Sequence, residues 1–252
     1  MARQRSEPSW YLDKLTAAQK REAHVGLVRR WAACLTVERV LKTDLFEEAF
    51  GEDQILPGMF PGARLVCGMD AAAGTAGAAA RRFAELAGRV AAMDVSCCGL
   101  KRAAFDLVIS TSTLDHFARR EEFLRALAEL SSAVRPGGLL ILTLDNPLNP
   151  LYHPLRWMSW AGLAPFRLGY TPSMGALRAD LRDAGFEVEA EDWLIHNPRL
   201  ISTALFLAWR MLAGRRADAG IAALLRVFDS LRRLPTRRWT ACFQAVAARR
   251  RI

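Results

Sequence analysis

The stretch FDLVISTSTLDHF, residues 105–117, decides the fold of this chain. Its first part, FDLVIS (105–110), is almost continuously apolar, which is typical of a strand buried on both faces of a parallel sheet. Polar side chains then follow at once, from Ser110 and Thr111 to Asp115 and His116. Because ligands bind at the carboxyl ends of strands in open α/β sheets, this stretch predicts both a buried strand and a candidate site.

Other short apolar runs of strand length surround it, namely RVLKT (39–43), ARLVCGM (63–69), GRVAAMD (88–94) and GLLILTL (138–144). Helical patterns lie between these runs. Residues 72–87 are rich in alanine, and residues 120–134 place apolar side chains on one stripe before RPGG ends the helix. This alternation of strands and helices predicts a Rossmann-like, doubly wound α/β sheet with right-handed crossovers.

Further elements are expected on both sides of this core. Residues 11–35 read as an N-terminal helix, so we divide the chain into a helical segment, 1–35, and a domain, 36–252. The proline-rich stretch DNPLNPLYHPLRW (145–157) is expected to form an irregular loop. The remaining pattern predicts a helix over 171–185 capped by Thr171 or Ser173, a strand over 186–194, a helical insertion at about 198–235 and a last strand over 239–249.

The formal net charge of +9 is regional, because residues 199–252 contain twelve arginines and only two acidic residues. One interpretation is compositional drift, since arginine far outnumbers lysine throughout the chain. The other is a contact with nucleic acid, anionic lipid or an acidic ligand. The apolar segment LISTALFLAWRMLAG (200–214) is shorter than the ~20 residues that span a bilayer. It predicts a helix that packs on its partner helix or, with its basic neighbours, one that lies on a membrane surface.

The five cysteines are scattered and show no zinc-ligand spacing, so we expect reduced thiols and no metal site. The N-terminus has no apolar core of the kind that a signal peptide requires. We therefore expect a cytoplasmic protein, with peripheral membrane contact through the basic C-terminal helices as the alternative.

Polar residues follow each predicted strand of the core. They are Thr43, Asp44, Asp70, Asp94, Ser110, Thr111, Asp145 and Asn146. Because parallel strands end at one edge of the sheet, these groups are expected to gather there. An acid after the second strand can accept hydrogen bonds from both hydroxyls of a ribose. The alternative is that each acid only caps the helix that follows it.

The blocks FDLVISTSTLDHF and RPGGLLILTLDNP (135–147) together resemble those of class I S-adenosylmethionine-dependent methyltransferases. LRADLRDAGFEVE (177–189) and TACFQAVAARR (240–250) resemble the closing part of the same family, so the similarity covers about residues 36–195 and 238–250. The resemblance implies a seven-stranded sheet with one antiparallel strand. It also implies S-adenosylmethionine bound across the first four strands.

The resemblance assigns expected roles to individual residues. Asp70 matches the acid that binds the ribose hydroxyls, and Asp94 matches the acid that often contacts the adenine amino group. Ser110 and Thr111 match the strand end that lines the methionine part of the cofactor. Asp115 and His116 match a segment close to the sulfonium in many members of the family.

The first strand departs from the family pattern. Members usually have an acid followed by glycines, whereas RVLKTDLFEEAFG (39–51) has Lys42 near the position of the acid and no glycine in the loop. A side chain could obstruct the close approach of the backbone to the cofactor. In compensation, Thr43 and Asp44 could meet the methionine amine and carboxylate. Glu47 and Glu48 would then lie in the first turn of the next helix, where its dipole favours acids.

Methyl transfer depends mainly on positioning, and a base is needed only when the acceptor loses a proton. His116 is the first candidate for that base, with ordering of its loop as the alternative, and His153 and His196 are second candidates. The acceptor pocket is expected from the N-terminal helix, the 146–170 loop and the inserted helices. Its expected lining is aromatic and apolar: Tyr152, Trp157, Met158, Trp160 and Phe166.

That lining suits a small, apolar or lipid-like acceptor better than nucleic acid, because the aromatic residues are not interleaved with basic ones. Two other hypotheses compete with an active methyltransferase. One is a methyltransferase-fold protein without activity that serves as a binding or scaffold partner. The other, a nicotinamide-dependent dehydrogenase, is disfavoured by the missing glycine fingerprint.

Overall fold

The computed structural model describes residues 13–163 and 168–252. Its centre is one seven-stranded sheet in the order β3-β2-β1-β4-β5-β7-β6, in which β7 runs antiparallel to both of its neighbours. The strands are β1 (Arg39–Thr43), β2 (Leu65–Asp70), β3 (Val90–Ala92), β4 (Phe105–Thr111), β5 (Val134–Asp145), β6 (Phe186–Leu194) and β7 (Phe243–Arg250). The predicted doubly wound sheet with one antiparallel strand is therefore confirmed.

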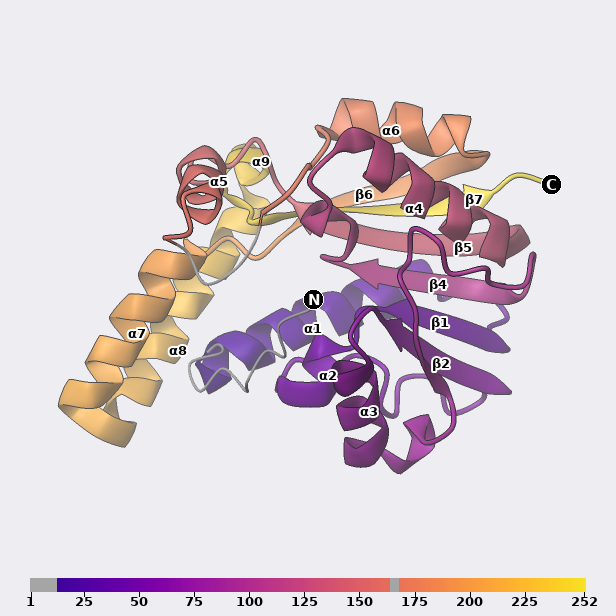
Figure 1. Ribbon diagram of the computed structural model, residues 1–252. Coiled ribbons are helices and arrows are strands. Elements are labelled where there is room, and N and C mark those ends of the chain that lie inside the picture. The colour runs from indigo at the N-terminus through magenta and orange to yellow at the C-terminus, as the bar shows by residue number, and fades with distance from the viewer. Residues whose placement is uncertain (1–12, 164–167) are drawn as a thin grey trace.

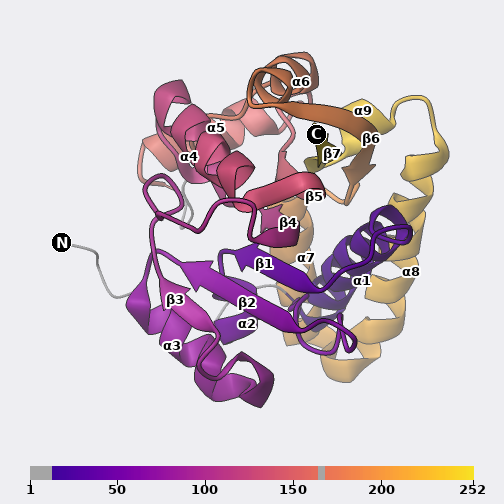
Figure 2. The ribbon, with the colours of Figure 1, turned by 90° about the vertical axis from the view of Figure 1, so that its right-hand side faces the viewer.

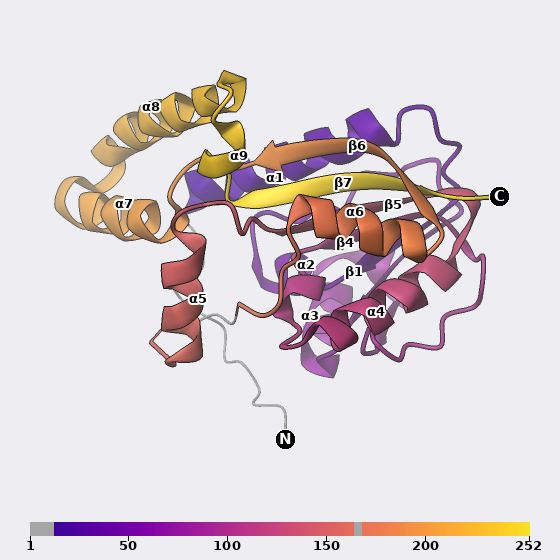
Figure 3. The same cartoon turned by 90° about the horizontal axis from the view of Figure 1, so that it is seen from above.

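Helices cover both faces of this sheet (Figures 1 and 2). The helices are α1 (Lys14–Trp31), α2 (Phe46–Phe50), α3 (Ala73–Arg82), α4 (Arg120–Ala133), α5 (Tyr152–Trp160), α6 (Met174–Asp183), α7 (Arg199–Ala213), α8 (Ala217–Ser230) and α9 (Arg237–Thr240). Helices α4 and α6 pack on one face of the sheet, and α1, α2 and α3 pack on the other. The helices α5, α7, α8 and α9 lie together at one end of the molecule (Figure 3).

The apolar runs of the sequence divide between two cores because successive side chains of a strand point to opposite faces. In β4, Val108 packs against α4 and α6, whereas Leu107 and Ile109 pack on the opposite face, among the residues of α1 and α3. Every residue of β4 is buried. This two-sided burial explains why FDLVIS lacks the apolar–polar alternation of a half-exposed strand.

The sequence RPGG, expected to precede β5, belongs to it. Val134 already pairs with Phe105, and regular pairing resumes only between Leu139 and Leu107. The extra residues form an irregularity in which Gly137 has a φ of 74°, a conformation that glycine adopts without a steric penalty. The sequence RPGG therefore both ends the helix α4 and forms the first part of the strand β5.

The prediction of an irregular loop after β5 was wrong in part, because residues 152–160 form α5. Pro154 lies in its first turn, where a proline costs no hydrogen bond because the first backbone N–H groups of a helix have no intrahelical partner. The turn before α5 is held by Asn146 and Asn149, whose side-chain amides both donate to the carbonyl of Ala241 at 2.9 Å.

The chain after α5 returns to the loop that follows β4. The backbone N–H of Gly169 donates to Asp115 O at 2.7 Å, and that of Tyr170 donates to Phe117 O at 2.6 Å. A Cβ atom on Gly169 would lie 2.0 Å from Phe117 O and 2.7 Å from Asp115 O. Only glycine lets the two backbones approach this closely.

Replacing Gly169 by alanine tests this approach. We expect Gly169→Ala to lower the free energy of unfolding by about 1–3 kcal/mol, because backbone atoms must move to admit the methyl group. Chemical denaturation measures the change. Gly175→Ala is the matched control, since a Cβ there meets nothing within 4 Å, and it should cause no loss. Equal stability of the two variants would contradict the close approach.

Candidate functional site

The carboxyl ends of β1, β2, β4 and β5 lie side by side, because these four strands are parallel and adjacent. Thr43 stands opposite Ser110 in the register of β1 and β4. The Thr43 hydroxyl donates to Ser110 Oγ at 2.9 Å and is also 2.9 Å from Thr113 Oγ1. The structure therefore joins two of the predicted site residues in one chain of hydroxyl groups.

Asp44 and Asp70 hold the turn that leaves β1. Asp44 has a φ of 62°, the left-handed conformation that favours glycine and that aspartate tolerates better than most residues. Its Oδ1 accepts from Phe46 N at 2.8 Å. Asp70 accepts from Leu45 N at 2.9 Å through one oxygen and from Ala72 N at 2.8 Å through the other. The chain thus keeps a glycine-like turn without a glycine.

Beneath this turn lies a buried ion network. The side chain of Lys42 is fully buried, and its Nζ donates to Glu48 Oε2 at 2.7 Å, to Glu47 Oε2 at 3.3 Å and to the carbonyl of Asp44. The other carboxylate oxygen of Glu47 accepts from Lys20 at 3.0 Å, and Lys20 is 2.6 Å from Asp53. One network therefore connects β1, α2, α1 and the loop after α2.

Glu48 extends the same network into the backbone. Its Oε1 accepts from Ile55 N at 3.0 Å and from Leu56 N at 3.2 Å. Burial by itself disfavours the charge of Lys42, but Glu48 and Glu47 outweigh that effect and raise the pKa of the ammonium above its ordinary range. Burial opposes ionisation of Glu47 too, yet Lys20 and Lys42 lower its pKa. Lys42 and Glu47 are therefore charged at neutral pH.

The pKa of Asp44 shifts in the opposite direction from that of Glu47. Burial, followed by the negative charge of Glu47, raises its pKa to about 7, although Lys42 acts in the opposite direction. Its carboxylate therefore changes charge near neutral pH, at the point where β1 meets the edge of the candidate site.

The remaining predicted site residues lie at different depths. Asp115 is buried, and its Oδ2 accepts from Asp145 N at 2.8 Å. His116, the next residue in the turn, is exposed. Thr111 is buried, with no hydrogen-bond partner for its hydroxyl among the described residues. Asp94 is exposed beyond β3, and its Oδ1 accepts from the N–H and hydroxyl of Ser96 at 2.8 and 2.7 Å.

The second candidate bases also differ in exposure. His153 is exposed on α5, whereas His196 is buried and its Nδ1 is 2.8 Å from Thr240 Oγ1. Burial lowers the pKa of His196. A further histidine, His24 in α1, lies beside the ion network, and burial followed by the charge of Lys20 lowers its pKa to about 4.

The expected aromatic lining does not form one enclosed group. Tyr152 is buried, and its hydroxyl is 3.5 Å from Gly169 O. Met158 is half-buried, whereas Trp157 is 61% exposed and Trp160 is 85% exposed. Phe166 lies outside the described residues. The two tryptophans therefore face outward from α5 instead of lining an interior cavity.

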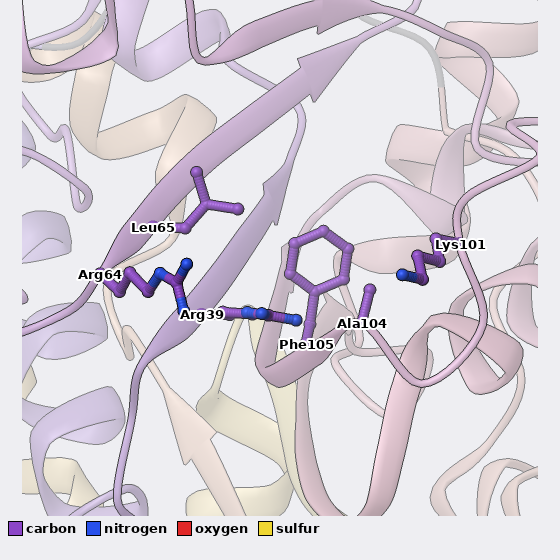
Figure 4. A pocket seen from close by; sticks show the side chains of 6 residues that line it. All are labelled: Arg39, Arg64, Leu65, Lys101, Ala104 and Phe105. Carbon is purple, nitrogen blue, oxygen red and sulfur yellow. The ribbon is translucent and has the colours of Figure 1, made fainter.

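A surface pocket lies at the opposite edge of the sheet (Figure 4). Arg39, Arg64 and Lys101 surround Phe105 there, at the amino ends of β1, β2 and β4. Because ligands of open α/β sheets bind at the carboxyl ends, this pocket is not the candidate site. Among the described residues, no group of three side chains could hold a metal ion.

Sequence reasoning missed Lys20, Asp53 and the pairing of Lys42 with Glu48. One signal was present: a lysine inside the apolar run RVLKT needs acidic partners, and two acids follow it in FEEAF. The participation of α1 and of the loop after α2 left no comparable pattern.

Comparison with known proteins identifies the family to which the chain belongs. The methyltransferase-domain family matches residues 37–191, and the chain therefore belongs to that family. It is a member of the class I S-adenosylmethionine-dependent methyltransferases, and the family and fold imply S-adenosylmethionine as the cofactor. A search of curated proteins finds no significant match to the chain.

Solved structures share the fold at low sequence identity. An S-adenosylmethionine-dependent methyltransferase from Archaeoglobus fulgidus is 15% identical with a TM-score of 0.60, over 96% of this chain and 100% of that one. Another from Mesorhizobium loti is 19% identical with a TM-score of 0.60, over 90% and 98%. The [4+2]-cyclase SpnF is 20% identical with a TM-score of 0.60, over 98% and 85%. At these identities the similarity shows the fold alone.

The residues at the edge of the sheet fit S-adenosylmethionine in their chemistry. The turn after β1 has the left-handed residue that a glycine normally supplies, and Leu45 is packed away against Gly68, where a Cβ would lie 2.5 Å from its Cδ2. Each Asp70 oxygen accepts one backbone N–H and retains a lone pair for a hydroxyl. Thr111 adds a buried hydroxyl without a partner among the described residues.

Removal of the buried ammonium tests the ion network. We expect Lys42→Met to lower the free energy of unfolding by about 3–5 kcal/mol, because Glu47 and Glu48 lose a buried counter-ion. The double variant Lys42→Met/Glu48→Gln should recover part of this loss. Lys101→Met, at an exposed lysine, is the control and should change stability by less than about 0.5 kcal/mol. A Lys42→Met chain as stable as that control would contradict the network.

The pH dependence of stability tests Asp44. Its folded pKa of about 7 exceeds the ordinary value of about 4, so the folded state retains a proton that the unfolded state releases between these pH values. Stability from this group is present below about pH 4 and is lost as pH rises through 7. Asp44→Asn should therefore match the wild type at pH 4.5 and melt at a higher temperature at pH 8. A difference that does not vary with pH would contradict the assignment.

Proposed function

We propose that this chain is an active S-adenosylmethionine-dependent methyltransferase whose acceptor is a small, apolar or lipid-like organic molecule. The observation that carries the proposal is the turn after β1. There Asp44 adopts the backbone conformation of the missing glycine, and Asp70 braces the next residue while keeping lone pairs for a ribose. A decayed loop would not be expected to keep both features.

The binding roles follow from the chemistry of each group. Asp70 would hold the ribose hydroxyls, and the exposed Asp94 would accept from the adenine amino group. Thr43 and Asp44 would hold the methionine amine and carboxylate, next to Ser110 and Thr111. Bound S-adenosylmethionine supplies an electrophilic methyl group on a sulfonium sulfur, which an acceptor nucleophile displaces in line.

The protein's own contribution is position and proton transfer. Asp115 accepts from Asp145 N and so fixes the turn after β4. His116 extends outward from that turn and would take the proton of an acceptor hydroxyl or amine. The apolar character of the acceptor is supported by Tyr152 and Met158 of α5, which follows β5 at the same end of the sheet. The buried Tyr152 lies beside Gly169, whose N–H bonds to the carbonyl of Asp115.

The alternative is a methyltransferase-fold protein that serves only as a binding or scaffold partner. It is favoured by one observation, namely that a buried lysine replaces the acid usual at the end of the first strand. The two proposals differ in whether S-adenosylmethionine binds at all.

Isothermal titration calorimetry with S-adenosylmethionine distinguishes them. We expect micromolar binding by the wild type and at least about tenfold weaker binding by Asp70→Asn, because one ribose hydrogen bond to a charged acceptor is lost. Asp183→Asn, at an exposed acid on α6, should bind as the wild type does. Formation of S-adenosylhomocysteine with apolar alcohols, phenols and amines then tests transfer. Absence of binding by the wild type would establish the alternative.

A further inference from the structure

The outer face of α7 is apolar although it is exposed. Met211 and Leu212 are each 88% exposed, Ile201 is 59% exposed and Leu205 is 50% exposed. Residues 201, 205, 208 and 212 recur at helical spacing and therefore form one stripe. Large exposed apolar patches of this kind mark interaction surfaces in proteins.

The opposite face of α7 is already occupied. Phe206 is fully buried and packs with Ala217, Ile221 and Leu225 of α8. Trp209 lies against Gly220, where a Cβ would be 2.4 Å from its ring. Helix α8 contacts α1, and α7 reaches the start of α1 through Arg210, so the two helices stand side by side at one end of the molecule (Figures 1 and 3).

The one charged side chain between residues 201 and 213 does not interrupt the apolar stripe. Arg210 turns to the inner side, where it donates to Asp13 and, at 2.5 Å, to Asp218. The guanidinium of Arg210 is therefore paired on the inner side of α7, and the exposed face of this helix carries no charge between residues 201 and 213.

Helix α5 adds two tryptophans at the same end of the molecule. Trp157 and Trp160 lie three residues apart, on one side of the helix, and both are mostly exposed. Figures 1 and 3 both show α5 and the α7–α8 pair together, at the carboxyl ends of β4 and β5. Tryptophan favours the boundary between water and an apolar phase, because one end of its ring system is polar.

Basic residues accompany this apolar surface. Exposed arginines just before, on and after α8 are Arg216, Arg226, Arg232, Arg233, Arg237 and Arg238. The two acids in the same region are compensated, Asp218 by Arg210 and Asp229 by Arg232 at 3.4 Å. Arg226 lies on the exposed side of α8, and Arg233 is exposed in the 3-10 turn Leu231–Arg233 that follows this helix. The region that carries the apolar face is therefore net positive.

We propose that the outer face of α7, together with Trp157 and Trp160 of α5, is a docking surface for an anionic lipid bilayer. A helix of 15 residues is about 22 Å long, shorter than the ~30 Å hydrocarbon core, and no described helix is long and apolar enough to cross it. The helix would thus lie along the surface, with its apolar face in the headgroup boundary and arginines near anionic headgroups.

Charge favours a bilayer over a second copy of the chain as the occupant. Symmetric pairing of two such surfaces would bring their arginines together, and like charges oppose that contact. The inference does not depend on methyl transfer, although docking would bring the carboxyl edge of the sheet close to the membrane and its lipid-soluble molecules.

Co-sedimentation of the full chain with vesicles tests the proposal. We expect binding to vesicles of 70% phosphatidylcholine and 30% phosphatidylglycerol at low salt, at least tenfold weaker binding to pure phosphatidylcholine, and weakening as salt is added. Met211→Asp/Leu212→Asp should reduce binding at least tenfold, and so should Arg226→Glu/Arg233→Glu. Arg81→Glu/Arg102→Glu carries the same charge change on exposed residues elsewhere and should bind nearly as the wild type does.

Thermal unfolding of each variant shows whether it is folded, and a charge variant that melts early is replaced by Met211→Ser/Leu212→Ser. Absence of vesicle binding by the wild type at low salt overturns the proposal, as does equal binding to the two vesicle compositions. A dimer in light scattering that Met211→Asp abolishes, without vesicle binding, would assign the surface to a second copy instead.

Discussion

The buried ammonium of Lys42 is the constraint on which the first half of the structure depends. A charge in the middle of a sheet is tolerated only when it is paired and hydrogen-bonded, and Lys42 meets this condition through Glu47, Glu48 and the carbonyl of Asp44. Glu47 also forms an ion pair with Lys20, so the N-terminal helix α1 takes part in the ion network. In this chain, an ion network therefore holds in place a turn that relatives build from glycines.

The network and the candidate site meet at two adjacent residues. Lys42 faces the network, whereas Thr43 bonds to Ser110 across the sheet and Asp44 adopts the left-handed turn that Asp70 braces. The negative charge of Glu47 balances Lys20 and Lys42 in the network. After burial, it is also the next largest reason why the pKa of Asp44 rises to about 7. The residues that stabilise the turn thus influence the charge that it presents to a ligand.

Most of the fold could be predicted from local sequence patterns, because buried parallel strands appear in the sequence as short apolar runs. The strands β1 and β6 match their expected ranges. The helix α5 was missed because three prolines within eight residues conceal that Pro154 occupies a first turn. At the site, the sequence predicted that polar groups gather at one edge of the sheet, but the pairing of Thr43 with Ser110 comes from the strand register of the structure. The local pattern also could not predict that Asp115 points inward and His116 outward, because a 3-10 turn sets those directions. Nor could it connect Lys20 to Glu47, which lies 27 positions away.

A crystal structure of the chain with S-adenosylhomocysteine would show whether a turn supported by buried ions replaces the glycine-rich loop. We expect the ribose hydroxyls at Asp70, the methionine part beside Thr43 and Asp44, and Lys42 still paired with Glu48. Lys42 turned out of the network toward the ligand carboxylate, or no ligand at this edge despite saturating concentrations, would contradict this expectation.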